Sequence, residues 1–183
     1  MKALFQKYRS VIRFVVLFLG TYLVLSICYA FYLNIFKGGE FPPDPVTHLV
    51  ARQSSALISS FGYQAEVIPH TTEPTMKLVV NGKFLARIIE GCNAVSIIIL
   101  FCAFVVAFAQ TLKKTLFFLF AGSVLIYGVN VLRIGVLAVS LYEYPQHKEM
   151  LHSVVFPGLI YSMVFILWMV WIRIVQLKPE TDE

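Results

Sequence analysis

Three side chains capable of acyl-transfer chemistry stand at the edge of, or inside, long apolar stretches of the sequence. They are Cys92, Arg133 and His152. A thiolate can attack a peptide carbonyl, a histidine can protonate the leaving amine, and a guanidinium can stabilise the oxyanion or the thiolate. Together these residue types can break and remake peptide bonds, provided that the fold brings them to one place.

The composition predicts that the elements holding these residues lie in a membrane. Hydrophobic residues make up 58% of the 183 positions and charged residues only 14%, whereas soluble domains carry about a quarter charged residues. The mean hydropathy of +0.77 is that of an integral membrane protein. The length predicts a single membrane domain over residues 1–183.

Four apolar runs are long enough to cross the hydrocarbon core as helices, which requires about 20 residues each. They cover about residues 14–36, 92–112, 115–142 and 153–173. The sequence therefore predicts an all-α polytopic membrane protein with four transmembrane helices. The first run is too long for the apolar part of a signal peptide and no clear cleavage site follows it, so we interpret it as a retained anchor.

Basic residues predict the orientation of these helices, because Lys and Arg collect in short cytoplasmic segments. They gather before residue 14, at Lys113 and Lys114, and after the last run. We therefore expect a multi-pass protein of the cytoplasmic (inner) membrane, with both termini in the cytoplasm and residues 37–91 outside. Membrane lipid is then a partner. Nucleic acid is not, since no basic stretch with interleaved aromatics lies outside the apolar runs.

The segment 37–91 has the pattern of a small folded α+β insertion, a helix plus a β-hairpin. Asp44 and Pro45 are suited to begin a helix, apolar residues then recur at helical spacing, and Gly62 can end it. Apolar β-formers flank Asn81-Gly82, which is a strong hairpin signal. The second strand of that hairpin leads directly to Cys92.

This topology places the three chemical residues at the outer face. Cys92 begins the second run and His152 begins the fourth. Arg133 lies about 12 Å below the outer end of the third helix, within reach of the same layer if its side chain extends upward. Asn130 precedes it by three residues on the same helical face, where it can orient the arginine or bind a partner.

Each of these residues also has a plain structural interpretation. Arg133 can anchor its helix to lipid headgroups, although a charge inside a span marks function by default. Cys92 can be a small interfacial residue, but a helix N-terminus and a nearby guanidinium both favour the thiolate, while Glu90 opposes it. His147, in the polar link before the last run, is a rival for the role of His152.

Three short motifs in this order resemble those of the exosortase and archaeosortase family. "EGCNA" resembles the cysteine motif, "NVLRI" (130–134) the arginine motif, and "HSVVFPG" (152–158) the histidine-led segment of that family. The short chain and single long outer loop are most similar to the exosortase F subfamily. Typical bacterial members have more spans, and many carry Ser-Gly where this chain has Asn93-Ala94.

The resemblance implies a membrane-embedded cysteine protease or transpeptidase that works through a thioester acyl-enzyme. Its partners would be proteins with a C-terminal sorting signal, composed of a short motif, a transmembrane helix and a basic cluster. Cys92 would be the nucleophile, Arg133 the electrostatic stabiliser and His152 the acid/base. Asn130, Glu90 and Asn93 would support them, without a metal or cofactor.

Two other classes of protein remain alternatives. A thiol-redox protein needs two cysteines close together, but Cys92 and Cys102 are about 15 Å apart along one predicted helix and Cys28 lies in another run. A non-enzymatic membrane assembly factor or transporter subunit would explain four helices and a buried arginine. It would not explain why Cys, Arg and His meet at one face.

Overall fold

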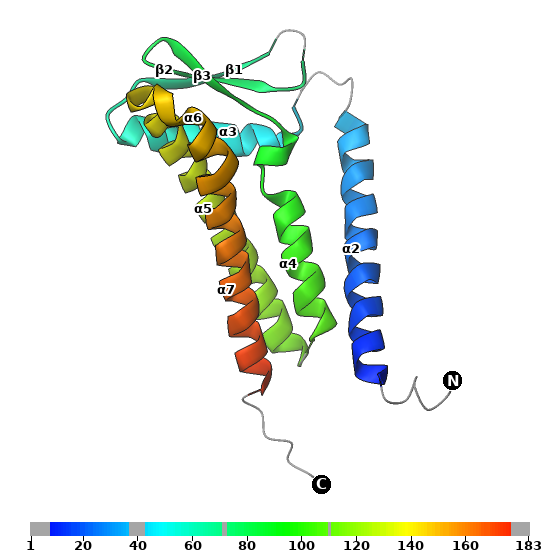
Figure 1. Ribbon diagram of the computed structural model, residues 1–183. Coiled ribbons are helices and arrows are strands. Elements are labelled where there is room, and N and C mark those ends of the chain that lie inside the picture. The colour runs from blue at the N-terminus through cyan, green and yellow to red at the C-terminus, as the bar shows by residue number, and fades with distance from the viewer. Residues whose placement is uncertain (1–7, 37–42, 71–72, 110, 177–183) are drawn as a thin grey trace.

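The computed structural model describes residues 8–36, 43–70, 73–109 and 111–176, apart from the side chains of Lys148 and His152. Apolar helices stand side by side, and a small α/β layer, the cap (residues 43–88), lies across one end (Figure 1). The helices of the bundle are α2 (Arg9–Phe36), α4 (Val95–Ala107), α5 (Leu112–Glu143) and α7 (Phe156–Gln176). The start of α2 and the end of α7 lie at the end away from the cap (Figure 1).

Three helices are long and apolar enough to cross a membrane: Arg9–Phe36, Leu112–Glu143 and Ser153–Gln176. The protein is therefore a multi-pass membrane protein. The predicted count of four spans is not confirmed, because the second apolar run forms a helix of only 13 residues, α4. At 1.5 Å per residue α4 is about 20 Å long, against a hydrocarbon core of about 30 Å.

Short as it is, α4 contacts all three longer helices. The tip of its Phe101 ring lies against Gly122 of α5, so close that a Cβ at Gly122 would clash with the ring. Phe108 packs on Phe14 of α2 with ring centroids 4.7 Å apart, and Phe104 stacks on Trp168 of α7 at 4.4 Å. Aromatic side chains thus pack α4 against each of the three longer helices.

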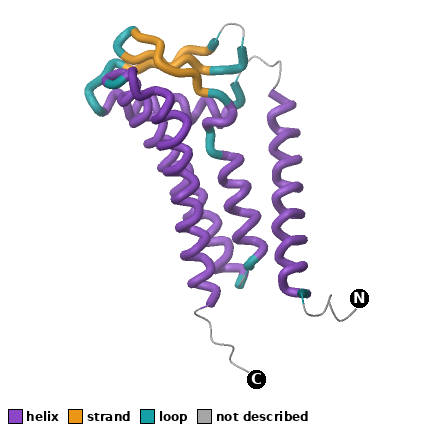
Figure 2. The backbone as a smooth tube through the Cα atoms, in the orientation of Figure 1, coloured by secondary structure: helices purple, strands orange, loops and turns teal. Residues whose placement is uncertain are grey.

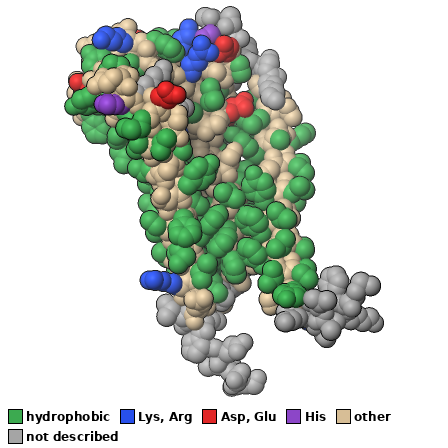
Figure 3. All heavy atoms as spheres, viewed as in Figure 1, with side chains coloured by type: hydrophobic (Ala, Val, Ile, Leu, Met, Phe, Trp, Pro, Cys, Tyr) green, Lys and Arg blue, Asp and Glu red, His purple; other side chains and the backbone are tan. Residues whose placement is uncertain are grey.

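The polarity of the surface changes along the axis of the bundle. Hydrophobic side chains cover the helices, whereas most of the charged side chains in view gather at the cap end (Figure 3). No residue of α2 is buried within the protein, as expected of a helix that contacts lipid over most of its circumference. This distribution matches a molecule whose bundle lies in the membrane and whose cap lies outside the hydrocarbon.

The cap helix is α3 (Pro45–Ser60), and it begins and ends where the sequence predicts. Oδ1 of Asp44 accepts hydrogen bonds from the N–H groups of Val46 (3.1 Å) and Thr47 (3.2 Å), which are the donors that a helix N-terminus leaves free. At the other end Gly62 has a φ of +92°, the conformation that stops a helix.

The sheet of the cap has three antiparallel strands in the order β1 (Ala65–Pro69), β2 (Met76–Val80) and β3 (Lys83–Ile88). Figure 2 shows them as one layer above the helices. The predicted hairpin is β2–β3, closed at Asn81 (φ 50°) and Gly82 (φ 74°) in the left-handed conformations of a type I′ turn. The sequence predicted this hairpin but not β1, which pairs with β2 along its whole length.

One hydrophobic core joins the cap to the half of α5 nearest to it. It consists of Val50, Ala51 and Ile58 of α3, Met76, Leu78, Val80 and Ile88 of the sheet, and Ile134 and Ala138 of α5. Gly135 lets α3 approach closely, since a Cβ there would lie 3.0 Å from Leu57 Cδ2. Tyr63 donates a hydrogen bond to Glu143 (2.9 Å), and this bond raises the pKa of Tyr63.

Candidate active site

Cys92 ends a tight turn between the sheet and the bundle. Ile89 follows β3, and Glu90–Cys92 form a single 3₁₀ turn, η1. The backbone N–H of Cys92 donates to the carbonyl of Ile89 (2.8 Å), and that of Asn93 donates to the carbonyl of Glu90 (3.3 Å). The rigid hairpin therefore passes directly into the segment that holds the thiol.

The prediction that Cys92 begins the apolar helix was wrong. Ala94 has a φ of 65°, and this left-handed residue separates the turn from α4, which begins at Val95. Asn93 Oδ1 accepts a hydrogen bond from the N–H of Val95 at 2.9 Å. The turn thus presents Cys92 beside the helix N-terminus and not as part of it.

Asn93 fixes this turn to two other elements. Its buried amide donates to the hydroxyl of Tyr29 on α2 (2.8 Å) and to Oγ1 of Thr47 on α3 (3.0 Å). Thr47 in turn donates to Oδ2 of Asp44 at 2.6 Å. The sequence singled out Asn93 but missed Tyr29 and Thr47, because partners 64 and 46 residues away leave no local pattern.

Asn130 joins the turn to α5. Its buried side chain donates to the backbone carbonyl of Cys92 at 2.7 Å. The predicted partnership with the site is thus present, and the bonded group is the backbone of the cysteine. Arg133 lies one helical turn further along α5. This bond therefore also fixes the position of Arg133 along the bundle axis relative to Cys92.

A pocket of about 300 Å³ opens between the cap, α5 and the start of α7. Cys92 and Arg133 both line it, together with Ile88, Leu137 and Phe156. Its volume is at the lower end of the range for ligand pockets. Two of the three residues that the sequence pointed to therefore share one cavity.

Within this pocket Arg133 is unpaired. Its Nε is buried and has no hydrogen-bond partner among the described residues, and within those same ranges no acidic side chain forms an ion pair with it. The other charged residue of the lining, Arg87, pairs with Glu73. A buried donor without a partner costs about 1–3 kcal/mol, so an acceptor atom entering the pocket would be bound favourably.

The third predicted residue, His152, lies in a π-helical turn, Leu151–Val155, just before α7, but its side chain is outside the described part of the structure. Phe156 and Pro157 of the same segment line the pocket. Single π-turns occur often at functional sites. The rival His147 is exposed and does not line the pocket, and neither does the partly buried Glu90.

The described residues contain no group of three or more His, Cys, Asp or Glu side chains placed to hold a metal ion. The described side chains around Cys92 supply a thiol, a guanidinium and side-chain amides. The site is thus built from the turn, α5 and the start of α7.

Comparison with known proteins gave one result. The model of the transmembrane exosortase family (Exosortase_EpsH) matches residues 6–172, a range that includes Cys92, Arg133 and His152. Neither the search of curated proteins nor that of solved structures found a match.

Proposed function

Because this chain belongs to the transmembrane exosortase family, whose membrane-embedded members are sorting-related proteases and transpeptidases with protein substrates, we propose that it processes C-terminal sorting signals with Cys92 as nucleophile. The signal would consist of a short motif, a transmembrane helix and a basic cluster. The short chain and its single cap are the basis for proposing the exosortase F subfamily.

One observation carries this proposal: Cys92 and Arg133, far apart in the sequence, line the same pocket. The hydrogen bond from Asn130 to the backbone of Cys92 fixes the cysteine turn against α5, the helix that carries Arg133. An arginine such as Arg133, whose buried Nε has no partner among the described residues, is costly in a mainly apolar pocket unless it serves a ligand or a reaction.

The proposed reaction begins when the Cys92 thiolate attacks the carbonyl carbon of the scissile peptide bond. The S–C bond forms, the C–N bond breaks, and His152 gives a proton to the departing amine. The thioester that results is then attacked by an acceptor, which is water, an amine or a glycan, and the thiol is released.

Arg133 is the proposed donor to the oxyanion. The nearby backbone N–H groups of Cys92 and Asn93 already donate within the turn, and that of Val95 donates to Asn93 Oδ1. The Arg133 Nε has no such partner among the described residues. This difference favours the guanidinium over the N–H groups of these three residues as the group that binds the developing charge.

We further propose that the cap and the pocket face the outside of the cytoplasmic membrane, with α4 as the fourth and shortest crossing. The concentration of charged side chains at the cap end (Figure 3) supports placing that end in water. Both termini would then be cytoplasmic.

The test is processing of a reporter protein that ends in a candidate sorting signal, co-expressed with the enzyme. Cys92→Ala and Cys92→Ser should abolish processing while the protein remains in the membrane. Cys28→Ala and Cys102→Ala are matched controls that should keep most activity, since Cys28 is exposed on α2 and Cys102 contacts only Ser123 among its described polar neighbours.

Full processing by Cys92→Ala would end the nucleophile proposal. Absence of processing by the wild type would instead favour the alternative, a non-enzymatic membrane assembly factor or transporter subunit. A membrane-impermeant thiol probe should also label Cys92 in preference to the two control cysteines.

A further inference from the structure

β3 is an edge strand. In the described residues it pairs with β2 on one side only, and no backbone hydrogen bond joins Lys83–Ile88 to any described residue outside the sheet. An edge strand offers alternate N–H and C=O groups to another extended chain. The opposite edge, β1, ends in Pro69, which lacks an N–H.

The free edge of β3 leads directly to the candidate nucleophile. Ile88 ends the strand, and four residues later Cys92 ends the 3₁₀ turn. The residues of β3 and the residues of the site line the same pocket, with Ala86 and Ile88 on one side and Phe156 of α7 on the other. A chain paired with β3 would therefore lie beside the pocket that Cys92 lines.

We propose that the substrate segment around the scissile bond binds as a fourth strand on the free edge of β3, with its scissile carbonyl beside Cys92. This inference rests on the proposed function and adds how the substrate is held. Main-chain hydrogen bonds give such a complex its affinity, and the side chains that point into pockets give it specificity.

The pocket defines which side chains the bound strand can carry. Successive residues of a strand point to opposite faces, so every second substrate residue would point into the pocket and the others to solvent. The lining is mainly apolar, its charged members are Arg87 and Arg133, and no acidic residue of the described chain lines it. The inward side chains are therefore apolar or acidic, and Lys or Arg is excluded there.

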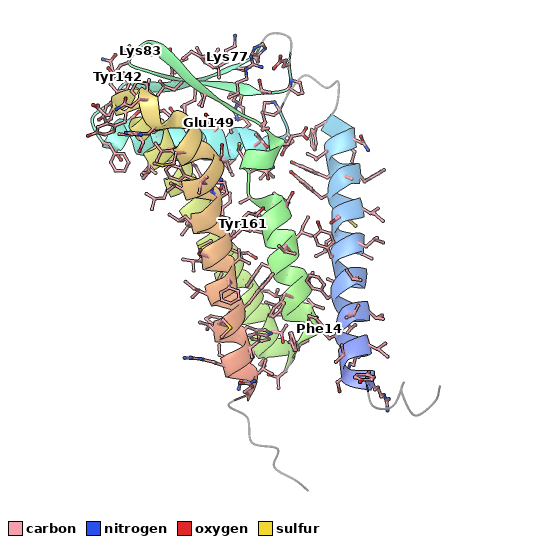
Figure 4. All side chains as sticks on the ribbon, viewed as in Figure 1. Phe14, Lys77, Lys83, Tyr142, Glu149 and Tyr161 are labelled. Atoms are coloured by element: carbon pink, nitrogen blue, oxygen red, sulfur yellow. The ribbon has the colours of Figure 1, made fainter. Side chains whose placement is uncertain are left out.

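The two faces of β3 can be told apart by their partners. Ala86 lies opposite Leu78, which is in the core, so Ala86 faces the bundle. Arg87 also lines the pocket, but it lies opposite Lys77 and its guanidinium pairs with Glu73, so its side chain is on the other face of the strand. In Figure 4 the labelled Lys77 lies at the sheet, away from the helices. Cysteines at positions 86 and 87 would thus sample opposite faces of a bound strand.

The experiment is disulfide trapping in the full-length membrane protein. Ala86→Cys and Arg87→Cys are each combined with Cys92→Ser, Cys28→Ala and Cys102→Ala. The probe is the reporter that the wild type processes, with one cysteine moved through the six residues around its cleavage site. We expect the cross-linked yield to alternate with a period of two residues, and the pattern for Arg87→Cys to be shifted by one residue from that for Ala86→Cys.

The outcomes separate the two proposals. Processing of the reporter by the wild type together with cross-links that do not alternate, or that form equally from both faces, would overturn strand addition and leave the nucleophile proposal intact. Absence of processing by the wild type would overturn both. The membrane abundance and the melting temperature of each variant, compared with those of the wild type, check that it folds.

Discussion

At the scale of single residues, Arg133 and Asn130 differ in the hydrogen bonds that they make at the site. Asn130 donates a hydrogen bond to the backbone carbonyl of Cys92, whereas Arg133 has a buried nitrogen that no described residue accepts from. One residue is therefore bonded to the protein before substrate arrives, and the other has a bond left to make. Substitutions at the two positions should differ accordingly.

We expect Arg133→Lys to insert normally but to process the reporter about 10²–10³-fold more slowly, the usual loss when an oxyanion donor is removed. Lysine keeps the charge but loses the planar set of donors, including the Nε. The measurement is the cleavage rate at matched membrane abundance. A rate near that of the wild type would reduce Arg133 to a structural anchor, because lysine anchors a helix about as well.

Asn130→Ala should have a milder effect than Arg133→Lys, because it removes one bond to the Cys92 carbonyl and leaves the reacting groups in place. The expected loss of stability is about 1 kcal/mol for one hydrogen bond. Measuring the cleavage rate and the melting temperature of the solubilised protein together separates this positioning role from a chemical one. A larger rate loss than that of Arg133→Lys would reverse the assigned roles.

At the scale of elements, the contact between α4 and α5 determines where the cysteine turn stands. Phe101 fills the space that Gly122 leaves open, whereas Gly128 on the same helix has open space around its Cα. We expect Gly122→Ala to destabilise the protein by about 1–3 kcal/mol, as overpacking does. Gly128→Ala is the matched control and should be neutral or slightly stabilising.

The measurement is the melting temperature of each variant in detergent. If overpacking is the cause, Phe101→Leu should partly restore the stability of Gly122→Ala, because the smaller side chain makes room for the new methyl group. Equal stability of the Gly122 and Gly128 variants would contradict this account of the α4–α5 contact.

Elements with local signals could be predicted from the sequence. Asp44 and Gly62 mark both ends of α3, and Asn81-Gly82 marks the β2–β3 turn. By contrast, β1 carries no clear alternation of its own and exists through its pairing with β2. Neither Gly nor Pro marks the break at Ala94 between the cysteine turn and α4. This break depends on Asn93, which residues of α2 and α3 hold in place.

The same distinction holds for the candidate site. Residue types and their membrane depth pointed to Cys92, Arg133 and Asn130, and the structure brings these three together. The contribution of Thr47 could not be predicted, because its hydroxyl reaches Asn93 only after the cap has folded. The assigned roles of all these residues remain predictions for the variants above.

At the scale of the whole molecule, the orientation in the membrane can be tested directly. Reporter fusions after residues 60 and 148 should score as extracytoplasmic, because α3 and the α5–α7 link lie at the cap end (Figure 1). A fusion after residue 176, at the end of α7, should score as cytoplasmic. A cytoplasmic score at residue 60 would contradict the outward-facing site.

The brevity of α4 creates a hydrophobic mismatch beside much longer neighbours. Its 13 residues cover about 20 Å, while the 32 residues of α5 cover about 48 Å. With α4 as the proposed fourth crossing, lipid next to it would thin or water would enter from the cap side, and either would bring the Cys92 turn within reach of polar acceptors. Acyl-chain length thereby becomes a control on catalysis: we expect liposomes of short-chain lipids to support faster processing than those of long-chain lipids, at equal amounts of inserted enzyme.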